Sequence, residues 1–90
     1  MNNSERINLC NSALEEFSAV LASDMYSEIY DYINKYNEWG VGIELLIDTV
    51  CEEEAIITTI QYEKVKLAMA SMGLGDSERL SSLNMCVKST

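Results

Sequence analysis

The sequence predicts an all-α protein, folded as a single small bundle of four or five helices over residues 1–90. Apolar residues recur at spacings of three and four along most of the chain, which is the period of one helix face. The chain contains no proline and four glycines, so it has few of the residues that separate short strands by turns. Ninety residues suffice for one domain and leave no room for a second.

The first helix is expected to start at a cap on Asn3 or Ser4 and to continue to about Leu21. Its buried side would consist of Ile7, Cys10, Ala13 or Leu14, Phe17, Val20 and Leu21. Ser23 and Asp24 then offer a break and a new N-cap. The second helix would place on its apolar side Met25, Ile29, Tyr32 or Ile33, and Tyr36.

The third helix is predicted from about Glu38 to about Glu53, with Asn37 as its N-cap. Its apolar set is Trp39, Ile43, Leu46, Ile47 and Val50. Gly40 and Gly42 fall in its first turn, where glycine costs less than in mid-helix and allows another backbone to approach closely.

Two further helices follow. Thr58 and Gln61 match a capping box, with Ile57 placed to pack on Tyr62, and Gly73 is a suitable stop because glycine adopts the left-handed conformation cheaply. The fourth helix, to about Met72, would bury Tyr62, Val65, Ala68 or Met69, and Met72, with Leu74 packing back on it. A last short helix, capped by Asp76 or Ser77, would carry Leu80, Leu83 and Met85.

Two segments have less regular patterns. Residues 54–57 fit either an extended linker or a short, buried, strand-like piece. Residues 88–90 are expected to fray at the end of the chain.

Charge is distributed unevenly along the chain, whose fifteen acidic and six basic residues give a net charge of −9. Residues 7–57 contain eleven acids and one base, whereas the rest contains four acids and five bases. This balance argues against nucleic acid or an anionic membrane as a direct partner, since both require a positive surface. The acidic stretch is either a solvated face that keeps the protein soluble or a docking surface for a basic protein.

The acidic residues of the third helix favour the docking surface. Glu44, Asp48 and Glu52 repeat every four residues, and like charges at that spacing destabilise a helix by about 0.2–0.5 kcal/mol per pair. Acids at a helix C-terminus also oppose the helix dipole. A cationic partner would offset both costs. The predicted partner-binding residues are Glu28, Asp31, Tyr32, Glu44, Asp48, Glu52, Glu53 and Glu54.

No catalytic or metal-binding pattern is recognisable. The chain has no histidine, which removes the commonest general base and any Cys–His nucleophile. Cys10, Cys51 and Cys86 form no C-x-x-C pair, so we expect reduced thiols rather than a disulfide scaffold or a zinc site. The sequence therefore predicts a binding protein, with no enzymatic activity, metal or cofactor. The polar N-terminus predicts no signal peptide, and the reduced thiols predict a cytoplasmic location.

Two stretches resemble the MafI-type immunity proteins of bacterial toxin systems. Residues 36–48, YNEWGVGIELLID, resemble the N-E-W/Y-G-x-A-x-E-x-L-x-D stretch of that family, with Gly42 in place of the usual alanine. Residues 57–65, ITTIQYEKV, followed by MGL at 72–74, are similar to its I-S-x-x-E-Y-x-x-I … M-G-L helix. The acidic run after Asp48 does not match closely, and the last helix lacks the aromatic residues usual in the family.

The resemblance implies a cytoplasmic, non-enzymatic protein that binds the C-terminal domain of one cognate toxin, most often a ribonuclease such as an EndoU-like enzyme. The motif itself assigns no binding residue. An acidic helical adaptor, or a nucleic-acid mimic that binds another basic protein, is the alternative function. Whether the free protein forms a homodimer stays open.

Overall fold

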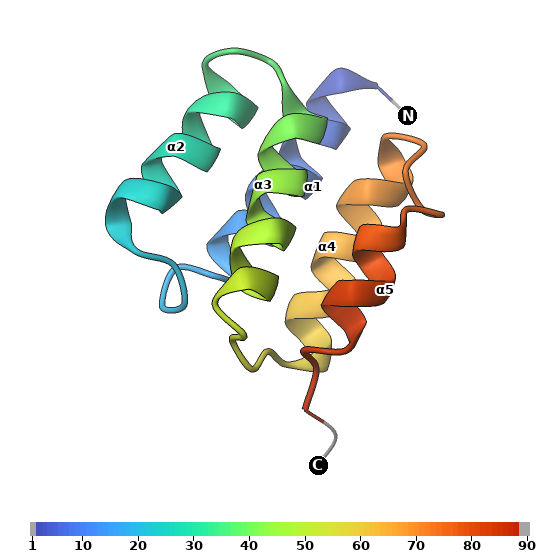
Figure 1. Ribbon diagram of the computed structural model, residues 1–90. Helices are drawn as coiled ribbons and strands as arrows, with labels where there is room; N and C mark the ends of the chain where they lie inside the picture. The colour runs from blue at the N-terminus through green and yellow to red at the C-terminus, as the bar shows by residue number, and fades with distance from the viewer. Residues whose placement is uncertain (1, 89–90) are drawn as a thin grey trace.

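The computed structural model describes residues 2–88 and contains five α-helices within them, which confirms the predicted all-α bundle (Figure 1). In chain order they are α1 (Asn3–Glu15), α2 (Ser23–Asn34), α3 (Trp39–Glu52), α4 (Thr59–Ser71) and α5 (Glu78–Asn84). No helix in this part of the chain is both long and apolar enough to cross a lipid bilayer.

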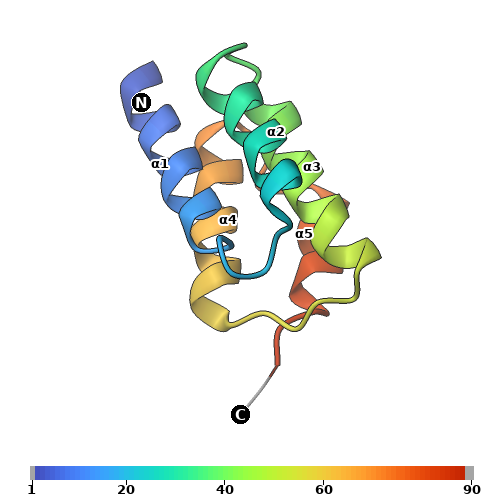
Figure 2. The same ribbon diagram turned by 90° about the vertical axis from the view of Figure 1, so that its left-hand side faces the viewer.

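Helix α3 is the centre of the bundle and contacts each of the other four helices. It packs mainly against α2 on one side and α5 on the other, while α1 pairs with α4 behind it (Figures 1 and 2). Its predicted inner residues Ile43, Leu46, Ile47 and Val50 are at most 1% exposed. The third helix therefore has the apolar face that its sequence period predicts, and it supplies a large part of the core.

Helix α1 is shorter than predicted and starts at a different cap. Its N-cap is Asn2, whose side chain accepts a hydrogen bond from the Glu5 amide at 2.9 Å, rather than Asn3 or Ser4. It ends at Glu15, and the chain continues through tight turns to Leu21. The Gln61 side chain of α4 donates to the Glu16 carbonyl at 2.8 Å and so satisfies the end of the helix from a distant segment.

The turns after α1 keep the predicted apolar residues in the core. Phe17 is fully buried and Leu21 is 7% exposed although neither belongs to a helix. The amide of Phe17 donates to the Leu14 carbonyl, and the Leu21 amide donates to the Phe17 carbonyl, each at 3.0 Å. Local hydrogen bonds thus allow a non-helical segment to place apolar residues where a helix was predicted.

Helix α2 differs from the prediction at both ends. Its N-cap is Ala22, so Ser23 and Asp24 were wrong as caps; the Asp24 carboxylate instead accepts a hydrogen bond from the adjacent Met25 amide. Tyr36, predicted on the apolar side, lies beyond the helix end and is 53% exposed. Ile29 and Ile33 are fully buried as predicted.

The link from α2 to α3 also corrects the predicted cap. Glu38 is the N-cap of α3 and makes no side-chain capping bond. Asn37 instead has a φ of 55°, in the left-handed region that asparagine tolerates better than most residues. The Glu38 amide donates to the Tyr32 carbonyl at 2.8 Å, which folds the link back onto α2 and requires this sharp turn at Asn37.

Gly42 allows α2 and α3 to pack closely, as the sequence predicted for a glycine in this turn. A Cβ at this position would lie 3.0 Å from Ile33 Cγ1 and 3.2 Å from Tyr32 Cβ. Gly40 does not have this role, since its Cβ would meet only Leu74 Cδ1 at 3.7 Å.

Both predicted ends of α4 are confirmed. Thr58 Oγ1 accepts from the Gln61 amide at 3.1 Å, and Gln61 Oε1 accepts from the Thr58 amide at 2.8 Å, which completes the capping box. At the other end Gly73 has a φ of 76°. The Leu74 amide donates to Met69 and the Gly73 amide to Ala70, the Schellman arrangement.

Of the two alternatives predicted for residues 54–57, the buried strand-like piece is found only at Ile57. Ile57 is 1% exposed and forms an isolated parallel bridge with Val87. Its amide donates to the Cys86 carbonyl at 3.0 Å, and its carbonyl accepts from the Lys88 amide at 3.1 Å. Lys88 is therefore held by a backbone bond rather than frayed, and the remainder of the predicted fraying tail, residues 89–90, lies outside the described residues.

Ser77 is the N-cap of α5, one of the two predicted residues, and accepts a hydrogen bond from the Arg79 amide at 3.2 Å. Leu80 and Leu83 are buried as predicted. Met85 is 87% exposed because it follows the last turn of the helix, so its predicted place on the apolar face was wrong.

Candidate functional site

The predicted residues of α2 line one shallow hollow on the surface. Glu28, Asp31 and Tyr32 surround it together with Asp24, Ser27 and Tyr36, and its volume is about 400 Å³. Glu28 is exposed, and Asp31 and Tyr32 are half-buried. The three residues singled out on this helix therefore share a site, because Asp31 and Tyr32 follow Glu28 by three and four residues and so lie on the same side of the helix.

An aromatic pair forms the end of this hollow. The rings of Tyr32 and Tyr36 meet edge to face with their centroids 5.9 Å apart. The ammonium of Lys35 lies 5.6 Å from the Tyr36 ring centre, within the range of a cation–π contact. Tyr36 was not among the predicted binding residues, because its helical spacing placed it on the buried side.

Two of the predicted acidic residues of α3 already bind a cation, because Arg79 of the same chain forms ion pairs with them. Arg79 of α5 donates through Nε to Asp48 Oδ1 at 2.9 Å and through Nη1 to Glu44 Oε2 at 3.0 Å. The hydrogen bond to Asp48 raises the pKa of Arg79, and the charges of Asp48 and Glu44 raise it further. The sequence offered no sign of this contact between distant segments.

Glu52, Glu53 and Glu54 are all exposed at the end of α3. Glu54 has a φ of 52°, where the chain leaves the helix and turns toward α4. The Glu53 and Glu54 amides still donate to carbonyls of the last helical turn, at 3.0 and 3.1 Å. This acidic turn carries three carboxylates with no ion pair within the described residues.

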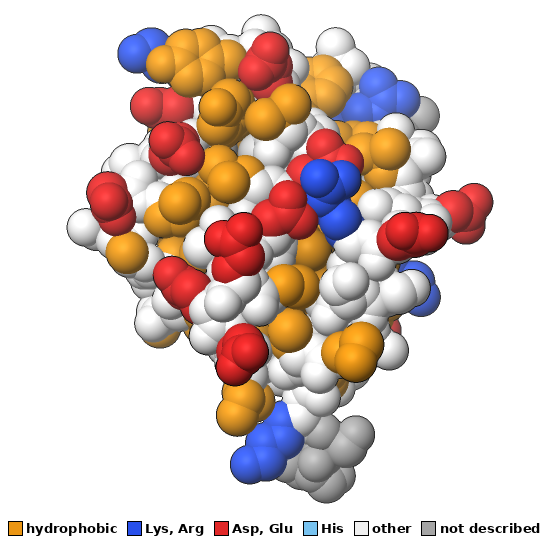
Figure 3. All heavy atoms as spheres, in the orientation of Figure 1, with side chains coloured by type: hydrophobic (Ala, Val, Ile, Leu, Met, Phe, Trp, Pro, Cys, Tyr) orange, Lys and Arg blue, Asp and Glu red, His pale blue; other side chains and the backbone are white. Residues whose placement is uncertain are grey.

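The surface over α2 and α3 has a mixed chemistry (Figure 3). Acidic side chains are spread among hydrophobic ones over these two helices, and basic groups are few on this face. We call this surface the α2–α3 face and define it by the predicted residues with Tyr36: Glu28, Asp31, Tyr32, Tyr36, Glu44, Asp48, Glu52, Glu53 and Glu54.

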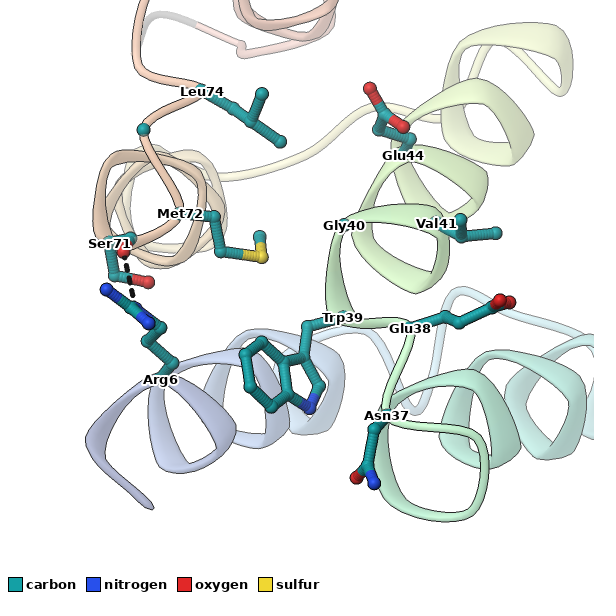
Figure 4. Close-up of a pocket in the computed structure, with 11 residues that line it drawn as sticks. Arg6, Asn37, Glu38, Trp39, Gly40, Val41, Glu44, Ser71, Met72 and Leu74 are labelled. Carbon is teal, nitrogen blue, oxygen red and sulfur yellow. Dashed lines mark hydrogen bonds between the residues drawn. The ribbon is translucent and has the colours of Figure 1, made fainter. Parts of the chain in front are cut away.

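A second hollow, of about 680 Å³, lies where the start of α3 meets the end of α4 (Figure 4). Residues 37–41 and 71–74 line it, together with Glu44 and Arg6. Arg6 of α1 donates through Nε to the Ser71 carbonyl at 3.0 Å and so ties α1 to α4 beside the hollow. The start of α3 around Trp39 and the end of α4 around Gly73, which are distant in the sequence, thus meet in space.

Two polar groups in the lining of this second hollow, the Ser71 hydroxyl and the Trp39 indole N–H, face the protein itself. Ser71 directs its hydroxyl to the Ala68 carbonyl at 2.7 Å, so it has no general base as a partner. Trp39 packs its ring against the core, and its indole N–H is buried without a partner among the described residues. Within residues 2–88, no group of three or more Cys, Asp or Glu side chains is placed to hold a metal ion.

Comparisons with protein-family models, with curated proteins and with solved structures find no match to this chain.

Proposed function

We propose that this protein is an immunity protein that binds the C-terminal domain of a cognate bacterial toxin and neutralises it by occlusion. The observation that carries the proposal is the α2–α3 face, which combines exposed carboxylates with a partly exposed tyrosine pair. Within residues 28–54, which contain all the residues of this face, Lys35 is the one basic residue, and Arg79 of α5 reaches the face at Glu44 and Asp48. A surface of this kind suits a basic partner.

A ribonuclease is the favoured partner because such enzymes carry a basic surface that holds phosphates. Carboxylates opposite that surface accelerate association, and the tyrosines supply apolar area with a polar tip at low entropic cost. The resemblance of residues 36–48 and 57–74 to MafI-type immunity proteins supports the same partner. A cytoplasmic site of action, where a toxin would meet RNA, belongs to this proposal.

The α2–α3 face equally suits the alternative function, an acidic helical adaptor or a nucleic-acid mimic that binds another basic protein. Gene order separates the two, because an immunity gene directly follows its toxin gene. Co-purification of the chain with the product of the upstream gene, followed by a ribonuclease assay, tests the proposal. We expect one-to-one binding and loss of ribonuclease activity; an upstream product that does not bind would contradict it.

The binding surface needs its own test with variants matched in charge. Glu28→Lys with Asp31→Lys, and separately Glu52→Lys with Glu53→Lys, should each weaken binding at least tenfold in low salt. Glu63→Lys with Glu78→Lys is the control, because it changes the net charge equally at exposed sites on α4 and at the start of α5. Equal losses in all three double variants would indicate a long-range effect of net charge rather than a surface on α2 and α3.

A further inference from the structure

Cys51 and Cys86 are side-chain neighbours where the end of α3, which packs against α5, meets the segment that follows α5. Cys51 is in the last turn of α3, and Cys86 comes two residues after α5. Both side chains are half-buried and pack against the same core, and neither is bonded to another cysteine. Figures 1 and 2 both show these two helix ends close together at the same end of the bundle.

Backbone hydrogen bonds hold the two cysteines in this arrangement. The Glu54 amide donates to the Cys51 carbonyl at 3.1 Å, and the Ile57 amide donates to the Cys86 carbonyl at 3.0 Å. The short segment from Cys51 to Ile57 is therefore hydrogen-bonded to the Cys51 carbonyl at its start and to the Cys86 carbonyl at its end. The Cys86 thiol points toward the Ser82 carbonyl, with 3.8 Å between sulfur and oxygen.

The Cys51 thiol lies close enough to Cys86 to be affected by it. Burial, the neighbouring Cys86 thiol and the Asp48 charge, in that order of size, together raise the pKa of Cys51 to about 11. Cys10 is in a different environment, on α1 and with none of its surface exposed. Two of the three cysteines are thus neighbours within reach of small oxidants, and the third is enclosed.

We propose that Cys51 and Cys86 are a modification site, at which a peroxide or a small-molecule disulfide converts the two thiols into a reversible intramolecular disulfide. With hydrogen peroxide, one thiolate attacks a peroxide oxygen and breaks the O–O bond to give a sulfenic acid. The other oxygen leaves as hydroxide, which takes up the proton that the thiol released and becomes water. The second thiol then displaces the hydroxyl as a second water and forms the S–S bond. A thiol such as glutathione reverses the reaction by thiol–disulfide exchange.

The bond would close a loop of 86 − 51 = 35 residues that contains α4 and α5. A cross-link over such a loop stabilises a fold mainly by restricting the unfolded chain. It would also fix the acidic turn of Glu52–Glu54 against the C-terminal segment. The chain then has a stabilised form under oxidising conditions and the described form under reducing ones, independently of which partner it binds.

Trypsin separates the three cysteines, which makes the test direct. The full chain is reduced, freed of reductant, exposed to oxidised glutathione, unfolded in guanidinium, alkylated there with N-ethylmaleimide and digested. Cleavage after lysine and arginine leaves Cys10 within residues 7–35, Cys51 within 36–64 and Cys86 within 80–88. We expect an intact mass that has lost two hydrogens and gained one maleimide, a linked 36–64/80–88 peptide, and a melting temperature raised by about 10 °C.

Single variants locate the bond. Cys51→Ser and Cys86→Ser should each abolish the linked peptide and the rise in melting temperature, whereas Cys10→Ser should retain both. Dithiothreitol should reverse the change in the unaltered chain. Recovery of three maleimide adducts after oxidation, a link that includes Cys10, or a disulfide between two copies of the chain would each overturn the proposal.

Discussion

Arg79 binds Asp48 across 2.9 Å and joins α5 to the central helix α3, with Glu44 one turn away as the second acceptor at 3.0 Å. The repeated acids of α3 were expected to need a cationic partner, and for two of them the protein supplies that cation itself. A basic partner that uses Glu44 and Asp48 must therefore displace Arg79 or bind beside it. Glu52 and the hollow on α2 have no such competitor among the described ion pairs.

Replacement of Arg79 should distinguish the contribution of Glu44 and Asp48 to stability from their contribution to binding a partner. Because the pair is solvent-exposed, Arg79→Ala should lower the melting temperature slightly, and about 1 M salt should remove most of the difference from the parent chain. Under the proposed function, the freed carboxylates should speed association with the toxin domain in low salt. A slower association rate, measured by stopped flow, would show that Arg79 itself contacts the partner.

The two glycines of α3 should respond oppositely to a larger side chain. Gly42→Ala should destabilise the fold by about 1–3 kcal/mol, because its Cβ would press on Tyr32 and Ile33 at 3.2 and 3.0 Å. Gly40→Ala is the matched control and should stabilise by up to about 1 kcal/mol, since its Cβ would meet Leu74 Cδ1 at an ordinary contact distance of 3.7 Å and alanine favours the helix. Urea unfolding of both variants measures the difference; equal effects would mean that α2 and α3 are not tightly packed at Gly42.

Burial rather than helical structure should decide the cost of losing an aromatic residue. Phe17→Ala should cost about 3–5 kcal/mol, because Phe17 is fully buried in a turn. Tyr36→Ala should cost less than about 1 kcal/mol, because Tyr36 is 53% exposed and loses mainly its contact with Tyr32. Thermal or urea denaturation tests both. A large loss of stability in Tyr36→Ala would show that Tyr36 is needed for folding, and it would weaken the proposal that Tyr36 serves the α2–α3 face in binding.

The stability of the protein should depend on the Thr58 hydroxyl, which forms part of the capping box of α4. Thr58→Ala should lower the free energy of unfolding by about 1 kcal/mol, because the Gln61 amide loses the acceptor at 3.1 Å. Thr58→Ser keeps the oxygen and should stay close to the parent chain. Equal stability of the two variants in urea titrations would show that the cap contributes little here.

The free energy of unfolding should fall at alkaline pH, because two thiols have a higher pKa in the folded protein than in the unfolded chain. Burial raises the pKa of both Cys10 and Cys51 to about 11, whereas thiols of an unfolded chain ionise near ~8.5. Above that pH the unfolded state binds fewer protons than the folded state, so stability decreases as pH rises toward 11 and is unaffected by these groups below about 8.

Urea unfolding with reductant present at pH 7, 9 and 10 measures this decline. Cys51→Ser and Cys10→Ala should each show a shallower fall than the parent chain, whatever their stability at pH 7. A fall of unchanged steepness in both variants would assign the alkaline sensitivity to other groups.

Local chemistry made several features predictable from the sequence. The apolar period placed Ile43, Leu46 and Val50 in the core, since only one face of a helix can turn inward. The ends of α4 were readable at Thr58, Gln61 and Gly73 because each cap is satisfied by residues within five positions along the chain. The α2 part of the α2–α3 face also followed from spacing, which brings Glu28, Asp31 and Tyr32 to one hollow.

The sequence by itself thus determined the fold class, the inner face of each main helix and the excess of acid on α1 to α3. Tertiary structure decided what depends on partners distant in the chain. It ended α1 at Glu15 with Gln61, exposed Tyr36 by turning the chain at Asn37, paired Arg79 with Asp48 and set Cys51 beside Cys86. The physical reason is range: caps and helix faces are fixed within one or two turns, whereas these contacts join elements whose positions only the packed core establishes.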